Sequence, residues 1–393
     1  MSVPNDGAPH SGVPDSGAPA GGAPAAGGSP RVSTQRVFPC TSCGATLEFA
    51  PGRDSLRCPY CGAEQHIQIA ADRAVQEHSW DEFVRLPRKP IATLAAHVFT
   101  CPGCGAITES DAISDRCQFC GAPVVATVDG GDMVVPEAVL PFTVDRPGVR
   151  EALQAWVTSR WFAPNALKKV TTAETVRSTY LPHWTYDAST SSHYTGERGE
   201  YYYETETYTV TDSEGRERTE TRQVRKTAWW PASGHVSRDF DDVLVRGTSK
   251  VPPDHLDSLE PWPLPEAKPY EPDYLAGHQT LRYDVEPEEG MGVAQNRMAS
   301  VIEQDCRRDI GGDEQRVHSV NTSYSRVMFK LMLLPVWVCM YLYAGKSYQV
   351  LINGRTAEVA GQRPYSKLKI ALAVIAALLV VTAIVLFFVL RRN

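Results

Sequence analysis

Recognisable catalytic frames are missing from this chain of 393 residues. It has no G-x-S-x-G turn of the hydrolases and no H-E-x-x-H helix of the zinc peptidases. The tetrapeptide 344–347, Ala-Gly-Lys-Ser, resembles the end of a phosphate-binding loop, but Met340 stands where that loop requires its first glycine. We therefore predict that the protein is not an enzyme. Ordinary structural roles are expected for its histidines His183, His193, His235 and His318.

The N-terminus lacks both parts of a secretory signal, the basic start and the apolar core. Residues 1–35 are mainly Gly, Ala, Pro and Ser and contain almost no large apolar side chains. Burial therefore cannot offset the entropy lost on ordering, and we predict a disordered arm over residues 1–35. The arm serves either as a solvated spacer or as a docking segment for a partner.

One stretch lacks charge, Pro and Gly altogether, the twenty-one residues 370–390. As an α-helix with about 1.5 Å rise per residue it reaches roughly 31 Å, the thickness of the hydrocarbon core of a bilayer. Lys367 and Lys369 precede it and suit the polar boundary of a membrane. We predict a transmembrane helix over residues 370–390 that holds the chain in a lipid bilayer by its C-terminal tail.

Cysteine is concentrated in pairs: eight of the ten cysteines form four Cys-x-x-Cys motifs, each followed by Gly-Ala. Two such motifs supply the four thiolates of a tetrahedral zinc site, and the glycine permits the tight turn that points backbone amides at the sulfurs. We predict two tandem zinc ribbons, over residues 36–69 and 97–128, with two structural zinc ions. The predicted ligands are Cys40, Cys43, Cys58 and Cys61, then Cys101, Cys104, Cys117 and Cys120. Iron in a rubredoxin-like site and disulfide bonds are the alternatives.

The predicted metal sites are closed, because protein thiolates fill all four positions and leave none for a reacting water. Zinc thiolates also require reduced cysteines, which the cytoplasm maintains. Basic residues flank both ends of the apolar stretch, so charge alone leaves the orientation of the helix undecided. The cysteines therefore lead us to predict a single-pass protein of the cytoplasmic membrane, with its N-terminus and soluble domains in the cytoplasm.

Positive charge is scarce on both cysteine modules, and the whole chain carries a net charge of −7. Residues 36–66 hold three arginines and three acidic residues, and residues 97–123 have a balance of −2. A zinc centre with four thiolates adds about two further negative charges. Nucleic-acid binding depends on a basic face, so we expect the ribbons to contact protein and not nucleic acid.

The chain between the cysteine modules and the apolar stretch predicts a mixed α+β domain over residues 133–362. Residues 200–210 alternate acidic with other polar and aromatic side chains, and a basic strand follows a turn at 212–215. This pattern predicts a long hairpin with opposite charges facing each other. We further expect helices over 145–161 and 292–309, strands over 280–285, 327–343, 348–352 and 356–359, and, in a linker over 70–96, a short helix within the helical apolar period of 70–83. The predicted fold class is α+β, rich in antiparallel hairpins, with two zinc ribbons and one C-terminal transmembrane helix.

Four motifs accompany the CxxCGA knuckles. They are Trp161-Phe-Ala-Pro-Asn, Tyr194-Thr-Gly-Glu-Arg-Gly-Glu-Tyr-Tyr, Asp309-Ile-Gly-Gly-Asp-Glu-Gln-Arg-Val-His-Ser-Val-Asn-Thr and Leu334-Pro-Val-Trp-Val. With them the chain resembles, over roughly residues 38–390, a bacterial family of tail-anchored zinc-ribbon membrane proteins. Members are often labelled transcription-factor-type zinc ribbons or primosomal superfamily II helicases, but this chain lacks the phosphate loop and the Asp-Glu-x-His box of a helicase. The resemblance implies a shared architecture and no established reaction.

These features predict a non-enzymatic adaptor that recruits a soluble protein partner or a large assembly to the cytoplasmic membrane. The zinc ribbons and the N-terminal arm would contact the partner, and a phage-tail-like contractile injection system is one candidate assembly. A membrane-tethered nucleic-acid-binding or transcription-related protein is the alternative. An enzyme with its site between the long hairpin and the final sheet is a third hypothesis.

Overall fold

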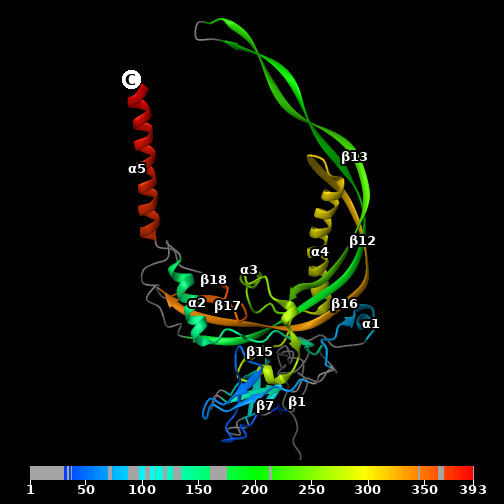
Figure 1. Cartoon of the computed structure of the whole chain (residues 1–393), viewed down its shortest axis with the longest axis vertical. Helices are drawn as coiled ribbons and strands as arrows, with labels where there is room; N and C mark the ends of the chain where they lie inside the picture. Colours follow the sequence, from blue (N-terminus) through cyan, green and yellow to red (C-terminus); the bar gives the residue numbers. More distant parts are fainter. Residues whose placement is uncertain are drawn as a thin grey trace, which may run out of the picture.

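The computed structural model describes residues 31–32, 35–36, 38–69, 73–86, 97–101, 107–110, 112–117, 122–126, 134–159, 175–211, 215–343, 346–361 and 367–392. These residues form a mixed α+β fold with a sheet-rich body and one apolar C-terminal helix, as the sequence predicts (Figure 1). Most of the predicted disordered arm lies outside the described residues.

Three long antiparallel strands organise the molecule: β12 (Thr175–Thr211), β13 (Glu217–Arg246) and β16 (Glu314–Tyr343). β12 lies in the middle and pairs with β13 on one side and with β16 on the other. At about 3.3 Å per residue, a strand of 37 residues runs for roughly 120 Å, far longer than the usual strand. Figure 1 shows the three strands curving away from the body, with β12 and β13 extending further than β16.

The other strands are short and complete three sheets. One three-stranded sheet contains β3 (Glu48–Phe49), β4 (Ser55–Arg57) and β5 (Glu64–His66). The second contains β1 (Arg31–Val32), β7 (His97–Thr100) and β8 (Ile107–Ser110). The large sheet adds to the long strands β2 (Gln35–Arg36), β6 (His78–Ser79), β9 (Ala112–Arg116), β10 (Pro123–Ala126), β11 (Ala138–Val139), β14 (Lys268–Pro269), β15 (Gln279–Leu281), β17 (Lys346–Asn353) and β18 (Val359–Gly361).

The helix α4 (Pro287–Ile310) lies inside the curve of the long strands and covers their concave face (Figure 1). Its buried residues recur every three or four positions, because one face of the helix packs on the sheet. They are Met291, Ala294, Met298, Ile302, Cys306 and Ile310, and they share a core with Trp184, Tyr186 and Phe329. The helix starts before the predicted position 292, since Pro287 suits the first turn and two glutamates follow it there.

The helix predicted after Asp145 is confirmed as α2 (Arg146–Thr158). The Asp145 carboxylate accepts a hydrogen bond from the N–H of Gly148 at 2.9 Å and caps the helix. The helical apolar period of the linker covers residues 70–83, but the helix found there, α1 (Trp80–Arg85), begins only at Trp80. The rings of Trp80 and Phe329 pack edge-on with their centroids 5.5 Å apart, so the first residue of α1 contacts β16. The remaining helical turns are α3 (Pro253–Asp257), η3 (Leu264–Glu266) and η4 (Pro272–Leu275).

Two bulges lie at nearly the same level of the long strands. β13 carries an extra residue at Asp242 opposite Asp187 of β12, and β16 carries one at Arg326 opposite Ala188. The backbone of both extra residues is left-handed, with φ of 52° at Asp242 and 51° at Arg326. Bulges bend a strand and increase its twist, so this level is where the arc of the sheet is bent locally.

The apolar C-terminal stretch forms the helix α5 (Lys367–Arg392). Its segment Lys369–Arg391 has 23 residues, and the most apolar 18 of these have a mean hydropathy of 3.2 and are not buried against the protein. Among the described residues it is the one helix long and apolar enough to cross a membrane. The structure therefore places a candidate membrane span where the sequence predicts one.

Candidate metal centre

Two matching turns build the first cysteine cluster, one after Cys40 and one after Cys58. In the first turn the N–H of Cys40 donates to the carbonyl oxygen of Ala45 at 2.6 Å, and the N–H of Gly44 donates to that of Cys40 at 2.8 Å. The equivalent bonds of the second turn, from the N–H groups of Cys58 and Gly62, measure 2.8 and 3.0 Å. Gly44 and Gly62 have φ of 74° and 75°, the left-handed conformation for which the sequence supplies a glycine.

These turns bring four sulfurs together. The Sγ atoms of Cys40 and Cys61 are 3.6 Å apart, and those of Cys43 and Cys58 are 3.5 Å apart. All four sulfurs lie within 4.8 Å of one another. A tetrahedral centre with metal–sulfur bonds of about 2.3 Å has its sulfurs roughly 3.8 Å apart. The cluster therefore has the donor set and the size to hold a metal ion.

Backbone amides favour the thiolate form at the two buried cysteines of the cluster. The N–H of Cys43 is the main cause that lowers the pKa of Cys40, and that of Cys61 lowers the pKa of Cys58 to about 6 against the effect of burial. At Cys43 the amide of Ala45 also lowers the pKa, but hydrogen bonds shared with Cys61 and Cys58 outweigh it and raise the pKa to about 12. Thiolates bind metal, so a bound cation would replace the shared protons.

The small sheet that carries this cluster is held against the body. The N–H of Phe49 donates to the carbonyl oxygen of Ala276 at 2.9 Å, and the rings of Phe49 and Tyr274 are 5.3 Å apart. The Arg116 guanidinium donates to both carboxylate oxygens of Glu48, each at 2.9 Å. The cluster is therefore positioned by both apolar and ionic contacts outside its own module.

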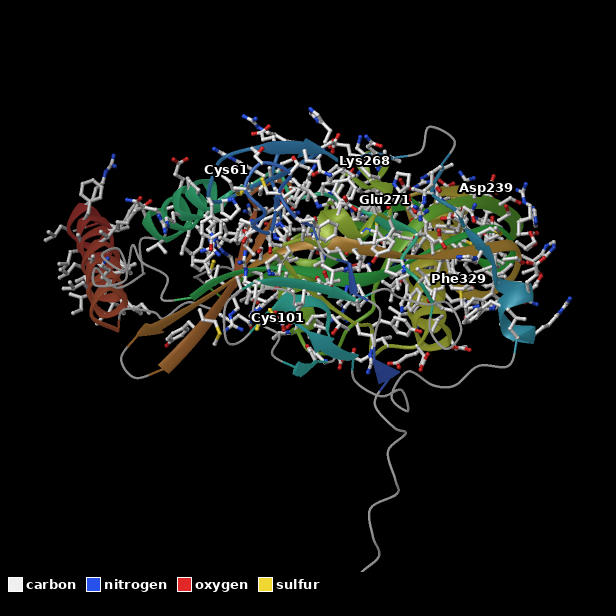
Figure 2. The ribbon with its side chains drawn as sticks, turned by 90° about the horizontal axis from the view of Figure 1, so that it is seen from below. Cys61, Cys101, Asp239, Lys268, Glu271 and Phe329 are labelled. Atoms are coloured by element: carbon white, nitrogen blue, oxygen red, sulfur yellow. The ribbon has the colours of Figure 1, made fainter. Side chains whose placement is uncertain are left out.

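The second predicted metal site is only partly within the described residues. Cys101 and Cys117 are buried, whereas Cys104 and Cys120 lie outside the described residues, so this ligand set stays a prediction. The N–H of Cys117 donates to the carbonyl oxygen of residue 122 at 2.8 Å, the same bond that closes both turns of the first cluster. Figure 2 shows Cys61 and Cys101 well apart, so Cys101 does not belong to the first cluster.

A second group of charged side chains, which no sequence pattern suggested, lies at the two bulges. The Lys330 Nζ is 2.7 Å from Glu77 Oε1 and 2.6 Å from Asp242 Oδ1. Asp187 adjoins them, and oxygens of the three carboxylates lie within 4.8 Å of one another. The buried ammonium of Lys330 already supplies the positive charge, so we interpret the group as an ion cluster that ties Glu77 and its segment to the long strands.

This ion cluster predicts a pH-dependent stability. Burial raises the pKa of Asp187 to about 7, with Glu77 adding to the effect and the N–H of Asp242 opposing it. A carboxyl that holds its proton more tightly when folded stabilises the fold at low pH, and this contribution is lost as the pH rises through about 7. Asp187→Asn should therefore raise the free energy of unfolding at pH 8 by about 2 kcal/mol and change it little at pH 4. Urea unfolding of the full chain in detergent at both pH values tests this.

An exposed aspartate supplies the control for that prediction. Asp241→Asn lies next to the bulge without belonging to the cluster, and it should shift stability equally at both pH values. A loss of stability at pH 8 on Asp187→Asn would show that the folded protein needs the Asp187 charge.

Among the described residues, the histidines do not assemble a recognisable catalytic group. His183 is buried, its Nδ1 lies 3.1 Å from the carbonyl oxygen of Leu181, and burial lowers its pKa to about 4. Ser191 Oγ is 2.8 Å from His235 Nε2, but no carboxylate contacts the second ring nitrogen of His235 in the part of the chain that is described. A serine and histidine pair without its orienting acid does not amount to a catalytic triad.

No family model and no solved structure matches this chain. The chain is similar to the uncharacterized protein YdjG of Bacillus subtilis (strain 168), with 24% identity over 342 residues. The similarity covers 85% of this chain and 92% of that protein. It therefore extends over most of the length of both proteins, and it brings no activity with it.

Proposed function

We propose that the protein is a non-enzymatic, single-pass adaptor of the cytoplasmic membrane that recruits a soluble protein or a large protein assembly. The observation that carries the proposal is the combination of a four-thiol cluster held against the body with one apolar C-terminal helix. A closed metal site stabilises a small module and leaves no position for a reacting water. A terminal helix of this length holds the attached body at a bilayer. Recruitment requires both parts.

The ion in the first cluster is proposed to be a structural zinc. Four sulfur donors around one centre favour zinc or an iron site among the metals of proteins. Small modules of this kind fold only with their metal, which suits a cluster surrounded by strands of two or three residues. We extend the proposal to the second set, Cys101, Cys104, Cys117 and Cys120, because the turn at Cys117 repeats the bond found in the first cluster.

The first module also presents a side chain suited to a protein partner. Tyr60 lies between Cys58 and Cys61, and 83% of its surface is exposed. Tyrosine is enriched at the energetic centres of protein interfaces. The exposed charges of Arg53 and Glu64 form an ion pair at 2.8 Å, so the module offers no excess of positive charge for phosphate groups. A contractile injection particle is one assembly that such a surface would recruit.

The cytoplasmic placement of the soluble domains rests on the cysteines. The four cysteines of the first cluster, Cys40, Cys43, Cys58 and Cys61, are not joined by disulfide bonds, because their paired sulfurs are 3.5 and 3.6 Å apart. Free thiols that bind zinc persist in a reducing compartment. We therefore propose that the body and the N-terminal segment face the cytoplasm.

The proposal is tested by comparing membrane fractions from cells with and without this chain. We expect at least one otherwise soluble protein to leave the membrane fraction when the chain is absent, and to return with the full chain but not with a chain that ends before α5. Tyr60→Ala should reduce that recovery about fivefold, the effect of losing an interface residue worth roughly 1 kcal/mol. Quantitative mass spectrometry of washed membranes measures both effects.

A matched variant and a clear negative result complete this test. Val293→Ala removes an exposed apolar side chain from α4, far in sequence from the first cysteine cluster, and should leave recovery unchanged. An identical membrane proteome with and without the chain would refute the adaptor function.

A further inference from the structure

The strand β12 leaves the three-stranded part of the sheet at Gly199. Its pairing with β16 ends there, opposite Glu314, whereas its pairing with β13 continues to Thr211 opposite Glu217. Over residues 200–211, β12 therefore has a neighbouring strand on one side only, within the chain as described. Figure 1 shows this part as a free tip that stands clear of the body.

The direction of the unpaired backbone groups follows from two hydrogen bonds at the end of β16. The N–H of Tyr201 donates to the Asp313 carboxylate at 2.7 Å, and the N–H of Asp313 donates to the carbonyl oxygen of Gly199 at 2.9 Å. The backbone N–H and C=O groups of successive residues alternate between the two sides of a strand. Those of the odd-numbered residues of β12 therefore point to the open side, and those of the even-numbered residues point to β13. The open edge is formed by Tyr203, Thr205, Thr207, Thr209 and Thr211.

The two outer edges of the tip differ in how they are protected. Along β13 the basic residues Arg218, Arg222, Arg225 and Lys226 are followed by Pro231. Long basic side chains and proline are the usual means by which an edge strand avoids pairing with another chain. Residues 200–211 of β12 contain no Lys, Arg, Pro or Gly, and consist of Tyr, Thr, Glu and Val. Most of these residues favour strands, so this edge is suited to pairing.

Acidic side chains surround the open edge. They are Glu200, Glu204 and Glu206 on β12, with Asp313 and Glu314 where β16 begins. Each of these three β12 glutamates has at least one basic neighbour within the described chain: Lys226 is 2.5 Å from Glu204, Arg222 is 3.2 Å from Glu206, and Arg198 is 2.6 Å from Glu200. A strand on the other side of β12 would lie beside the same carboxylates, and basic residues on that strand would form further ion pairs with them.

The side chains on the two faces of β12 at the open edge indicate which residues a matching partner strand should carry. The side chains of even-numbered residues lie on the same face as Tyr194, which packs against α4. Beyond α4 this face carries the three glutamates of residues 200–211 together with Tyr202 and Tyr208, which are exposed by 45% and 39%. The odd-numbered face carries Tyr203 and threonines and no charge on β12. A matching strand has Lys or Arg on one face and Val, Ile or Thr on the other, which means that the two kinds alternate along its sequence.

We propose that the open edge of β12, over residues 200–211, is a docking site for an extended segment of a partner protein in which basic residues alternate with β-branched ones. The segment lies where β16 would continue beyond Glu314 and runs antiparallel to β12. Main-chain hydrogen bonds hold it, and the carboxylates select the sign of its charge. The site uses neither the cysteine cluster nor α5, so it stands independently of the proposed adaptor function.

The probe is a synthetic peptide as long as the 203–211 edge, with Lys or Arg alternating with Val. Its binding to the full chain in detergent is measured by fluorescence anisotropy. One reference peptide has Glu at every basic position, and another has Pro at alternate positions, which removes backbone donors. The basic peptide should bind at least about tenfold more tightly than either reference, and more weakly as salt is added. Equal affinity for the basic and acidic peptides, or no binding of the basic one, would overturn the proposal.

Two proline variants locate the binding on one edge. Thr207 and Thr221 face each other across the hairpin, and their N–H groups point away from it, one towards each outer edge. Thr207→Pro removes a backbone donor from the open edge and should lower the affinity for the basic peptide about tenfold. Thr221→Pro should leave that affinity unchanged. Far-ultraviolet circular dichroism checks that both variants keep the hairpin. Equal effects of the two variants would reject this edge as the site.

Discussion

Replacing Cys58 by serine should abolish metal binding at the first cysteine cluster and unfold the module around it. Cys58 is buried, and its sulfur lies 3.5 Å from that of Cys43. Structural zinc in small modules contributes an apparent binding free energy of about 10–16 kcal/mol, more than such a module can supply from its own core. We expect the metal content to fall by about one ion per chain, as measured by elemental mass spectrometry. Hydrogen exchange of the amides in residues 40–66 should become fast, while that of β12 and β16 stays slow.

The control for this variant is a cysteine outside the cluster. Cys306 is buried on α4, and Cys306→Ala should cost some stability but leave the metal content unchanged. Metal that is unchanged in Cys58→Ser, or a disulfide among the four cysteines of the purified wild-type chain, would contradict the metal centre. Iron in place of zinc would keep the site and change its proposed ion.

The elements that were predicted well are those whose cause is local. Each turn of the first cluster depends on a cysteine, a glycine with positive φ and a short backbone bond, all within six residues, so the CxxCGA pattern was sufficient to predict it. The cap of α2 is similar, because Asp145 and Gly148 are neighbours in sequence. The charged hairpin was also predictable, since Thr211 and Glu217 face each other with only five residues between them, which fixes the register of the two strands.

The parts that the sequence did not predict depend on contacts between distant positions. Lys330 pairs with Glu77 across 253 residues, and no periodicity links those two sites. The same holds for the bulges, because a register shift arises only when three strands are brought together and their twist is adjusted. The point at which β16 stops pairing with β12, at Gly199, could not be predicted for the same reason. That endpoint creates the open edge, so the proposed docking site could not be found from sequence.

Placing two arginines in the middle of α5 should release the protein from membranes. Leu379 and Val380 lie near the centre of the apolar segment Lys369–Arg391, and nothing in the described protein covers either side chain. A charged side chain at the centre of a membrane span costs about 2.5–3.5 kcal/mol on insertion scales, so the double change Leu379→Arg with Val380→Arg costs roughly 6 kcal/mol. We expect most of the protein to move from the carbonate-washed membrane pellet to the soluble fraction, as measured by immunoblotting.

The same variant separates anchoring from folding. Because α5 has no buried contact with the body, the double arginine variant should keep the metal content and the thermal unfolding temperature of the wild-type body. The apolar change Leu379→Ile with Val380→Ile keeps the hydrophobic length and should remain in the pellet. A double arginine protein that stays in the washed pellet would show that another surface binds the membrane. A lowered unfolding temperature would instead show that α5 packs against the body, and that the anchor is part of the folded core.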